Sequence, residues 1–220
     1  MSDPWARLRR ERDRLYEQPV DLTPRPGSAS RTEITTVMQI QHANNDGNVH
    51  GGAIMRLVDE AAGIAAIRHA RRRVVTVSMD DMSFVAPVYI GDLVTVRATV
   101  NDAHRTSMEV GVRVDTENLA SGEWRHVASA HLVFVALDAE GRPAPVAPVL
   151  AESADEVRRQ LQAQVRHLLN IAGKLKCQVV YAHNGKAARV PTLRVDQPAG
   201  DPQHQPRADQ QQGGHHPPVK

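Results

Sequence analysis

Asp59 is the residue of this sequence best placed for acid–base or nucleophilic chemistry. It lies in the segment His50 to Ala70, which starts with two glycines after the histidine and is rich in alanine. As a helix at 100° per residue, this segment would be apolar around most of its circumference, with Ile54, Leu57, Val58, Ala61, Ala62 and Ala65 on one side and Met55, Ile64, Ala66 and Ile67 extending it. Such a helix is usually buried, so the sequence predicts a carboxylate within a core helix.

A structural explanation for Asp59 is also open. Arg56 and Glu60 form the one clear polar edge of the expected helix, and Arg56 precedes Asp59 by three positions. An ion pair at this spacing is common and contributes only ~0.2–0.5 kcal/mol. Asp59 is therefore either a desolvated catalytic group or one member of a half-exposed surface pair.

Alternating apolar and polar residues predict strands on both sides of this helix. One strand precedes it and four follow without another helix, at Glu33 to Gln41, Val74 to Phe84, Asp92 to Val100, Ser107 to Glu117 and Trp124 to Leu137. This order is incompatible with repeated βαβ units. It favours an α+β fold, in which one antiparallel sheet wraps around a long central helix.

The remaining segments are expected to be peripheral. The sequence predicts an N-terminal helix (Pro4 to Gln18) and a linker (Asp21 to Ser30) in residues 1–30, a single domain over 31–149, a C-terminal helix over 150–172 and a disordered tail over 173–220. The C-terminal helix has its own apolar period, through Val157, Leu161, Val165, Leu168 and Leu169.

Composition indicates a cytoplasmic protein that binds a small molecule. The formal net charge of +2 is a weak basic bias that suits an anionic small molecule better than nucleic acid. Cys177 is the only cysteine, so no intrachain disulfide can form. No apolar run approaches the ~18–20 residues that span a bilayer, and no secretory signal is recognised, so no membrane partner is expected.

Two stretches carry a family resemblance. HANNDGNVHGG, followed after six residues by DEAAGIAA, resembles the acyl-CoA thioesterases of the hot-dog fold, specifically the cytosolic acyl-CoA hydrolase group. The stretch VVTVSMDDMSFVAPVYIGDLVTVRATV is similar to the next two strands of that group, including the Phe-x-x-Pro and Ile-Gly-Asp turns. The resemblance covers about Glu33 to Val149 and implies a hydrolase that converts acyl-CoA to a free acid and CoA.

The resemblance also implies a composite catalytic site. Asp59 would act as general base or as nucleophile, together with Asn44 of the loop before the helix. The N–H groups at Gly51 and Gly52, unpaired at a helix start, would stabilise the developing oxyanion. One domain carrying all these residues implies a homodimer with two composite sites, with further assembly to a tetramer or hexamer open. For Asn44, a simple turn role is the alternative.

Other residues are assigned to substrate binding. Arg105 and Ser107, in the turn between two expected strands, are similar to an Arg/Ser-bearing loop of bacterial relatives and are expected to contact CoA phosphates. An exposed arginine in a hairpin is otherwise a solvated turn residue. Met82 and Phe84 are expected to line the acyl channel.

We expect neither a metal nor a separate cofactor, since CoA is part of the substrate. His42 and His50 lack a third ligand at a suitable spacing, and His50 is expected to be structural, at the helix start. The loop before the helix does not fit a calcium-binding pattern, because carboxylates are missing at its first and last positions.

Two other functions remain as alternatives. Hot-dog proteins include enoyl-CoA hydratases and dehydratases, which pair a histidine with an acid, but the expected helix has no histidine after its start until His69 at its far end. A non-catalytic acyl-CoA-binding protein is the second alternative.

Overall fold

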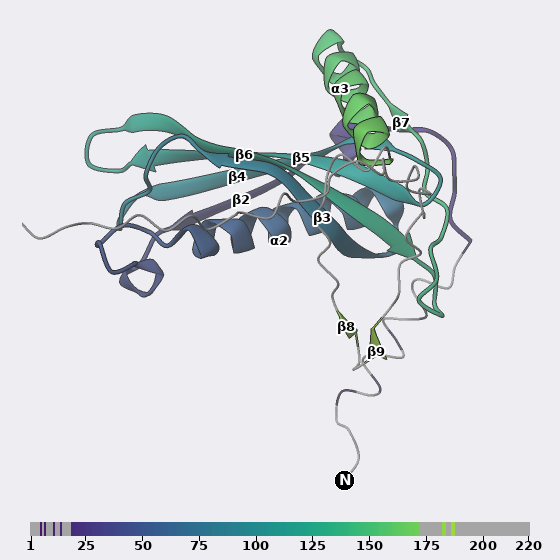
Figure 1. The fold of residues 1–220 in the computed structure, drawn as a ribbon, viewed down its shortest axis with the longest axis horizontal. Coiled ribbons are helices and arrows are strands. Elements are labelled where there is room, and N and C mark those ends of the chain that lie inside the picture. Colours follow the sequence, from purple (N-terminus) through teal and green to yellow (C-terminus); the bar gives the residue numbers. More distant parts are fainter. Residues whose placement is uncertain are drawn as a thin grey trace, which may run out of the picture.

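The computed structural model describes residues 19–171, together with Trp5, Arg7, Glu11 and Arg14 near the N-terminus and 182–183 and 186–187 beyond α3. Its elements are β1 (Arg25–Pro26), η1 (Gly27–Ser30), β2 (Thr32–Val37), η2 (Ile40–His42), α2 (Gly51–Ala70), β3 (Arg73–Phe84), β4 (Leu93–Ala103), β5 (Ser107–Asn118), β6 (Glu123–Leu137), β7 (Val149–Leu150), α3 (Ala154–Ile171), β8 (Ala182–His183) and β9 (Lys186–Ala187). The main sheet is antiparallel in the order β2-β4-β5-β6-β3, with α2 along one face (Figure 1). The predicted α+β fold, a sheet wrapped around a central helix, is confirmed.

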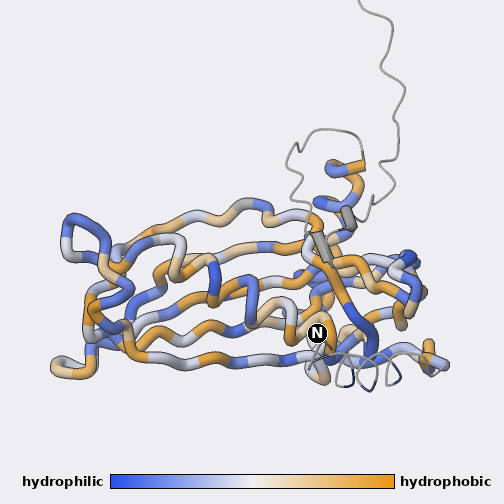
Figure 2. The backbone as a smooth tube through the Cα atoms, turned by 90° about the horizontal axis from the view of Figure 1, so that it is seen from below, coloured by the Kyte–Doolittle hydropathy of each residue, from blue (hydrophilic) through white to orange (hydrophobic). Residues whose placement is uncertain are grey.

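Small side chains on α2 allow the sheet to approach it closely. Alanines at five positions of the helix are completely buried, namely Ala61, Ala62, Ala65, Ala66 and Ala70. They pack on a sheet face formed by alternate residues of β4, β5 and β6, including Val94, Val96, Val110, Val114, Leu132 and Phe134. Figure 2 shows the alternation of apolar and polar residues along the strands. The buried face provides most of the hydrophobic stabilisation of the domain.

Three expected segments differ from the structure or fall outside it. The first strand ends at Val37 rather than Gln41, because Gln39 and His42 form a reciprocal capping box that starts η2. The expected linker contains β1 and η1, and its Ser30 is fully buried, with the hydroxyl accepting a hydrogen bond from the Val100 N–H at 2.9 Å. Most of the expected N-terminal helix and of the tail over 173–220 lies outside the described residues.

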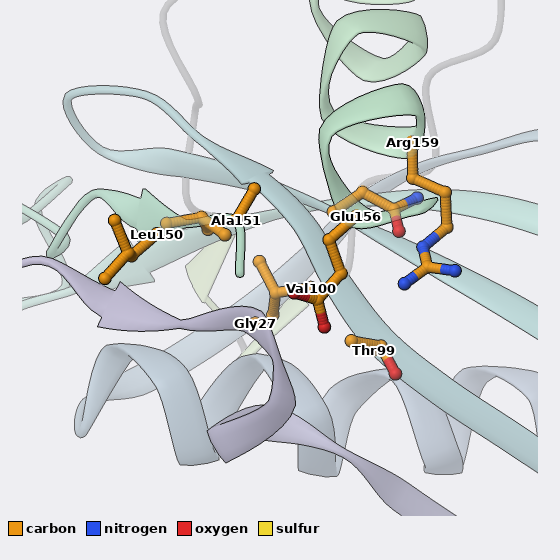
Figure 3. A pocket seen from close by; sticks show the side chains of 9 residues that line it. Gly27, Thr99, Val100, Leu150, Ala151, Glu156 and Arg159 are labelled. Carbon is orange, nitrogen blue, oxygen red and sulfur yellow. The ribbon is translucent and has the colours of Figure 1, made fainter. Parts of the chain in front are cut away.

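The C-terminal helix α3 packs on the sheet face opposite α2 (Figure 1). Where it meets η1, β4 and β7, Glu156 and Arg159 border a small hollow with Gly27, Thr99 and Leu150 (Figure 3). Its free volume of about 10 Å³ holds at most one water molecule. This hollow is therefore a packing gap rather than a binding site.

His69 makes the stability of this fold depend on pH. Burial lowers the pKa of His69 below its ordinary value, and the charge of Arg25 lowers it further. The hydrogen bond between Nε2 and the Ala147 carbonyl, at 2.8 Å, raises the pKa but does not offset the effect of burial. The unfolded chain takes up a proton at His69 near pH ~6.5 while the folded protein resists it. We therefore expect the free energy of unfolding to fall as the pH decreases from 7.5 to 5.5, measured by urea denaturation.

His69→Gln keeps an amide that can donate to the Ala147 carbonyl but removes the titrating group. We expect this variant to lose stability less steeply over the same pH interval. Burial also lowers the pKa of His167, so a smaller slope of the same sign should remain. A slope equal to that of the unsubstituted protein would contradict the assignment to His69.

Candidate active site

Asp59 faces the strand that follows its helix. It lies half-buried in the third turn of α2, and its Oδ1 accepts a hydrogen bond from the Thr76 hydroxyl of β3 at 2.8 Å. Sequence reasoning did not single out Thr76. The sequence nonetheless contained a signal for it. Thr76 is two positions after Val74, which packs on the core, so both side chains lie on the same face of the strand. A hydroxyl on this largely apolar face points to a specific hydrogen-bond partner.

The surface ion pair considered for Asp59 is not formed. Arg56 instead pairs with Glu60, with 3.5 Å between Nε and Oε1, and both side chains are largely solvent-exposed. This leaves the carboxylate of Asp59 with a neutral hydroxyl as its hydrogen-bond partner within the described part of the chain. A carboxylate held in this way keeps lone pairs available to accept a proton from water.

The start of α2 is capped by His50. The His50 Nδ1 atom accepts a hydrogen bond from the Gly52 N–H at 2.9 Å, which confirms the structural role predicted for this histidine. One of the two predicted oxyanion donors is therefore occupied. Within the described residues the Gly51 N–H has no hydrogen-bond partner, and it lies at the positive end of the helix dipole.

Asn44 shapes the loop that leads into this helix. Its Oδ1 accepts hydrogen bonds from the N–H groups of Asp46 at 2.9 Å and Asn48 at 3.0 Å, so the turn role considered for it is observed. Within the described chain its Nδ2 group has no hydrogen-bond partner, and Asn44 lines the same hollow as Gly51. Asn44 can therefore hold the loop with its oxygen and still donate a hydrogen bond with its nitrogen.

An open hollow of about 430 Å³ lies beside the start of α2. It is lined by Asn44, Asn48, Val49, Gly51, Ile54, Phe84, Val85, Ala86, Pro87 and Val88. Phe84, predicted to line an acyl channel, is 44% exposed here, whereas Met82 is partly buried against the core. The hollow thus joins two possible hydrogen-bond donors to an apolar wall.

Some of the predicted site residues are far apart within one chain. Asp59 follows Gly51 by eight positions on a helix, which corresponds to ~12 Å along the helix axis. Arg105, in the turn between β4 and β5, and Ser107, the first residue of β5, lie at the other end of α2. The Arg105 carbonyl accepts a hydrogen bond from the Val146 N–H, and the carbonyl of the neighbouring Ala147 bonds to His69. One chain therefore does not bring Asp59, the helix start and Arg105 to a single point.

Sequence relatives of the chain are acyl-CoA thioester hydrolases. The family model of the Thioesterase superfamily matches residues 46–122. An uncharacterized acyl-CoA thioester hydrolase of Bacillus subtilis is 41% identical over 114 residues, covering 52% of this chain and 66% of the relative. The cytosolic acyl coenzyme A thioester hydrolase of Mus musculus is 33% identical over 69% of this chain, which spans only 40% of that protein.

Solved structures show the same fold along nearly their whole length. An apo-hexameric acyl-CoA thioesterase aligns with a TM-score of 0.67 and 33% identity, covering 69% of this chain and 97% of that one. An acyl-CoA hydrolase from Staphylococcus aureus, in complex with butyryl coenzyme A and coenzyme A, aligns with a TM-score of 0.64 and 32% identity over 68% of this chain and 92% of that one.

The Staphylococcus aureus hydrolase was also solved as alanine variants of one asparagine, one aspartate and one threonine. In that protein the aspartate follows the asparagine by fifteen positions, and the threonine follows the aspartate by seventeen. Asn44, Asp59 and Thr76 have the same residue types at the same two spacings.

No helix within the described residues is long and apolar enough to cross a membrane.

The extent and identity of the matches, together with the sheet wrapped around α2, establish the family. The chain belongs to the Thioesterase superfamily, among the acyl-CoA thioesterases of the hot-dog fold.

Proposed function

We propose that this protein hydrolyses acyl-CoA to a free carboxylic acid and CoA. The observation that carries the proposal is the Asp59 carboxylate, held by the Thr76 hydroxyl on a largely apolar helix. The matching residue types and spacings in the Staphylococcus aureus hydrolase support it. The substrate class implies a place in cytoplasmic fatty-acid metabolism. The proposed chemistry needs no metal or separate cofactor.

In the proposed reaction, Asp59 accepts a proton from water as the water oxygen attacks the thioester carbonyl carbon. The carbonyl oxygen becomes negatively charged and is stabilised by the Gly51 N–H and the positive end of α2. The carbon–sulfur bond then breaks, and CoA leaves as a thiolate that takes up the proton. A route through a covalent anhydride on Asp59 reaches the same products, with water entering in the second step.

We further propose that the site is completed across a homodimer. The ~12 Å between Gly51 and Asp59 along α2 is too long for both to act on one carbonyl group, so the two must come from different chains. Two surfaces support such pairing. The strand β3 is an edge of the sheet along its 12 residues, and α2 exposes Met55, Ile64 and Ile67 to 39–43%. Open edges and exposed apolar side chains favour association with another chain.

The positions of the remaining residues relative to α2 suggest which part of the substrate each one contacts. Asn44 Nδ2 would donate a hydrogen bond to the bound thioester, and Phe84 and Met82 would contact the acyl chain. Arg105 is exposed and lies with Ser107 at the far end of α2 from Gly51, so we assign these residues to the phosphates of a CoA molecule.

Thiol release from a panel of short, medium and long acyl-CoAs tests the proposed function directly. We expect CoA and free acid in equal amounts, with a preference for one range of chain lengths. Loss of the ultraviolet absorbance of an enoyl-CoA without thiol release would instead indicate a hydratase. Calorimetric binding of acyl-CoA without turnover would indicate a binding protein, and either result would overturn the proposal.

A further inference from the structure

Three side chains on β5 and β6 form a series of hydrogen bonds of the Ser-His-Asp type. The Ser129 hydroxyl oxygen lies 3.1 Å from Nε2 of His126, and Nδ1 of the same ring lies 3.1 Å from Oδ1 of Asp115. A serine beside a histidine that is itself oriented by a carboxylate is the arrangement that activates a hydroxyl as a nucleophile. Such sites are recognised by this geometry rather than by the order of the residues in the sequence.

A β-bulge brings His126 and Ser129 to the same face of the sheet. Side chains three positions apart in a regular strand point to opposite faces. In the register of β5 and β6, Asp115 pairs with His126, whereas the residue before Asp115 pairs with Ala128. Val127 is therefore an additional residue in β6. An extra residue of this kind changes the direction of the neighbouring side chains, and such bulges are frequent beside active sites.

The charge of Asp115 determines where the protons of this series lie. Burial alone would raise the pKa of Asp115, but hydrogen bonds from Arg113 and His126 lower it below its ordinary value. Arg97 and Arg113 hold its Oδ2 atom at 3.0 and 2.9 Å. An ionised carboxylate only accepts hydrogen bonds, so Nδ1 of His126 donates to it, and Nε2 of the neutral ring is left as an acceptor. The Ser129 hydroxyl therefore donates to Nε2, which can remove its proton.

The three residues lie on the sheet face opposite α2. Ser129 is exposed, whereas Asp115 is only 6% exposed. The helix α3 packs on another part of this face, where Arg166 binds Glu109 of β5 (Figure 1). Asp115 is six positions further along β5 than Glu109, which corresponds to ~20 Å in a strand. The Ser129 hydroxyl is thus accessible to a small molecule and is separated by the sheet from Asp59 on α2.

We propose that Ser129, His126 and Asp115 form a second hydrolytic site, for carboxylic esters with short acyl groups. The Ser129 oxygen attacks the ester carbonyl carbon while its proton passes to Nε2 of His126. The bond from this carbon to the alcohol oxygen breaks, the alcohol takes the proton from Nε2, and the acyl group stays on Ser129. Water then attacks the acyl carbon and gives a proton to His126. The acid leaves as this proton returns to the Ser129 oxygen.

Arg113 supplies hydrogen-bond donors for the oxyanion of this reaction. It pairs with Ser129 in the register, and the Cβ atoms of residues paired in this way are ~4.5–5.5 Å apart. Its Nε donates to Asp115 at 2.9 Å and so holds the guanidinium, whose other N–H groups can donate to the developing negative charge. On an open sheet face, contacts are limited to groups near the carbonyl, which favours a short acyl group and a good leaving alcohol.

Diisopropyl fluorophosphate, which phosphorylates activated serine hydroxyls, tests the site in the full chain. We expect one label per chain, assigned to Ser129 by peptide mass spectrometry. Ser129→Ala should remove the label and the burst of p-nitrophenol from p-nitrophenyl acetate, and His126→Gln should slow both reactions about 10²-fold. The control is Ser121→Ala, which removes an exposed serine of the β5–β6 turn and should change neither reaction.

Asp115 is a positioning residue, because it acts through His126. Asp115→Asn should slow labelling about tenfold or more, since an amide can hold the imidazole in the wrong tautomer. Asp115→Glu, which restores a carboxylate, should recover part of the rate. Asp115 also binds two arginines, so the melting temperature of both variants is measured alongside. Ser129→Ala changes an exposed side chain and keeps the test independent of folding.

A label that is absent, or that is found on another serine, would overturn the inference. Ester hydrolysis that is unchanged in Ser129→Ala but lost in Asp59→Asn would also overturn it, because ester turnover would then belong to the Asp59 site. Thiol release from acyl-CoA is measured on the same variants and should be retained in Ser129→Ala. Its absence from the unsubstituted protein would contradict the proposed thioesterase activity, whereas labelling of Ser129 would still support the second site.

Discussion

Asp59→Asn is expected to reduce the kcat for acyl-CoA hydrolysis by about 10²–10⁴-fold, the usual contribution of a positioned general base. Asparagine has nearly the same shape as aspartate, and its carbonyl oxygen can still accept the Thr76 hydrogen bond. It cannot accept a proton from water or form an anhydride. Thiol release at saturating acyl-CoA measures the loss, and the KM should change little because the substitution leaves the binding surface intact.

Two further variants separate chemistry from structure. Glu60→Gln removes the neighbouring carboxylate, which pairs with Arg56 at the surface, and should leave kcat within about two-fold, since exposed pairs contribute little. Thr76→Val removes the hydrogen bond to Asp59. A hydrogen bond to a charged group contributes ~1.5–3 kcal/mol, so its loss should lower kcat about 10- to 100-fold. Full turnover in Asp59→Asn would exclude both proposed routes.

Phe134→Ala is expected to lower the free energy of unfolding by about 3–5 kcal/mol, the range for a buried phenylalanine. Phe134 is 2% exposed and lies on β6 opposite both Thr76 of β3 and Met108 of β5. Its ring also reaches α2, where a Cβ added at Gly63 would lie 3.9 Å from it. The substitution therefore opens a cavity beneath the helix that carries Asp59. Urea denaturation measures the change.

Phe84→Ala is the matched control, because the chain has only these two phenylalanines. Phe84 is 44% exposed at the hollow beside Gly51, so its removal buries little less apolar surface. The free energy of unfolding should therefore change by less than about 1 kcal/mol. We expect instead a higher KM for longer acyl-CoAs. Equal destabilisation by the two substitutions would contradict the arrangement of the core.

The sequence by itself determined the elements of the fold and predicted the residues of the candidate site. Periodicity predicted α2 to within a residue at each end, because a run of small apolar residues and a histidine cap specify a buried helix locally. The alternation of residues likewise predicted β3 to β6 within a few positions. A carboxylate among small apolar side chains is costly to bury, which singled out Asp59, but its catalytic role was predicted from the family resemblance.

The tertiary structure alone decided which groups meet. Thr76 becomes the partner of Asp59 only when β3 packs beside α2. The period of α3 did not reveal which side packs, because that depends on Glu109, Asp102 and Asp80 gathering on one sheet face. Hydrogen bonds between distant residues follow from strand order and register, which local periodicity does not encode.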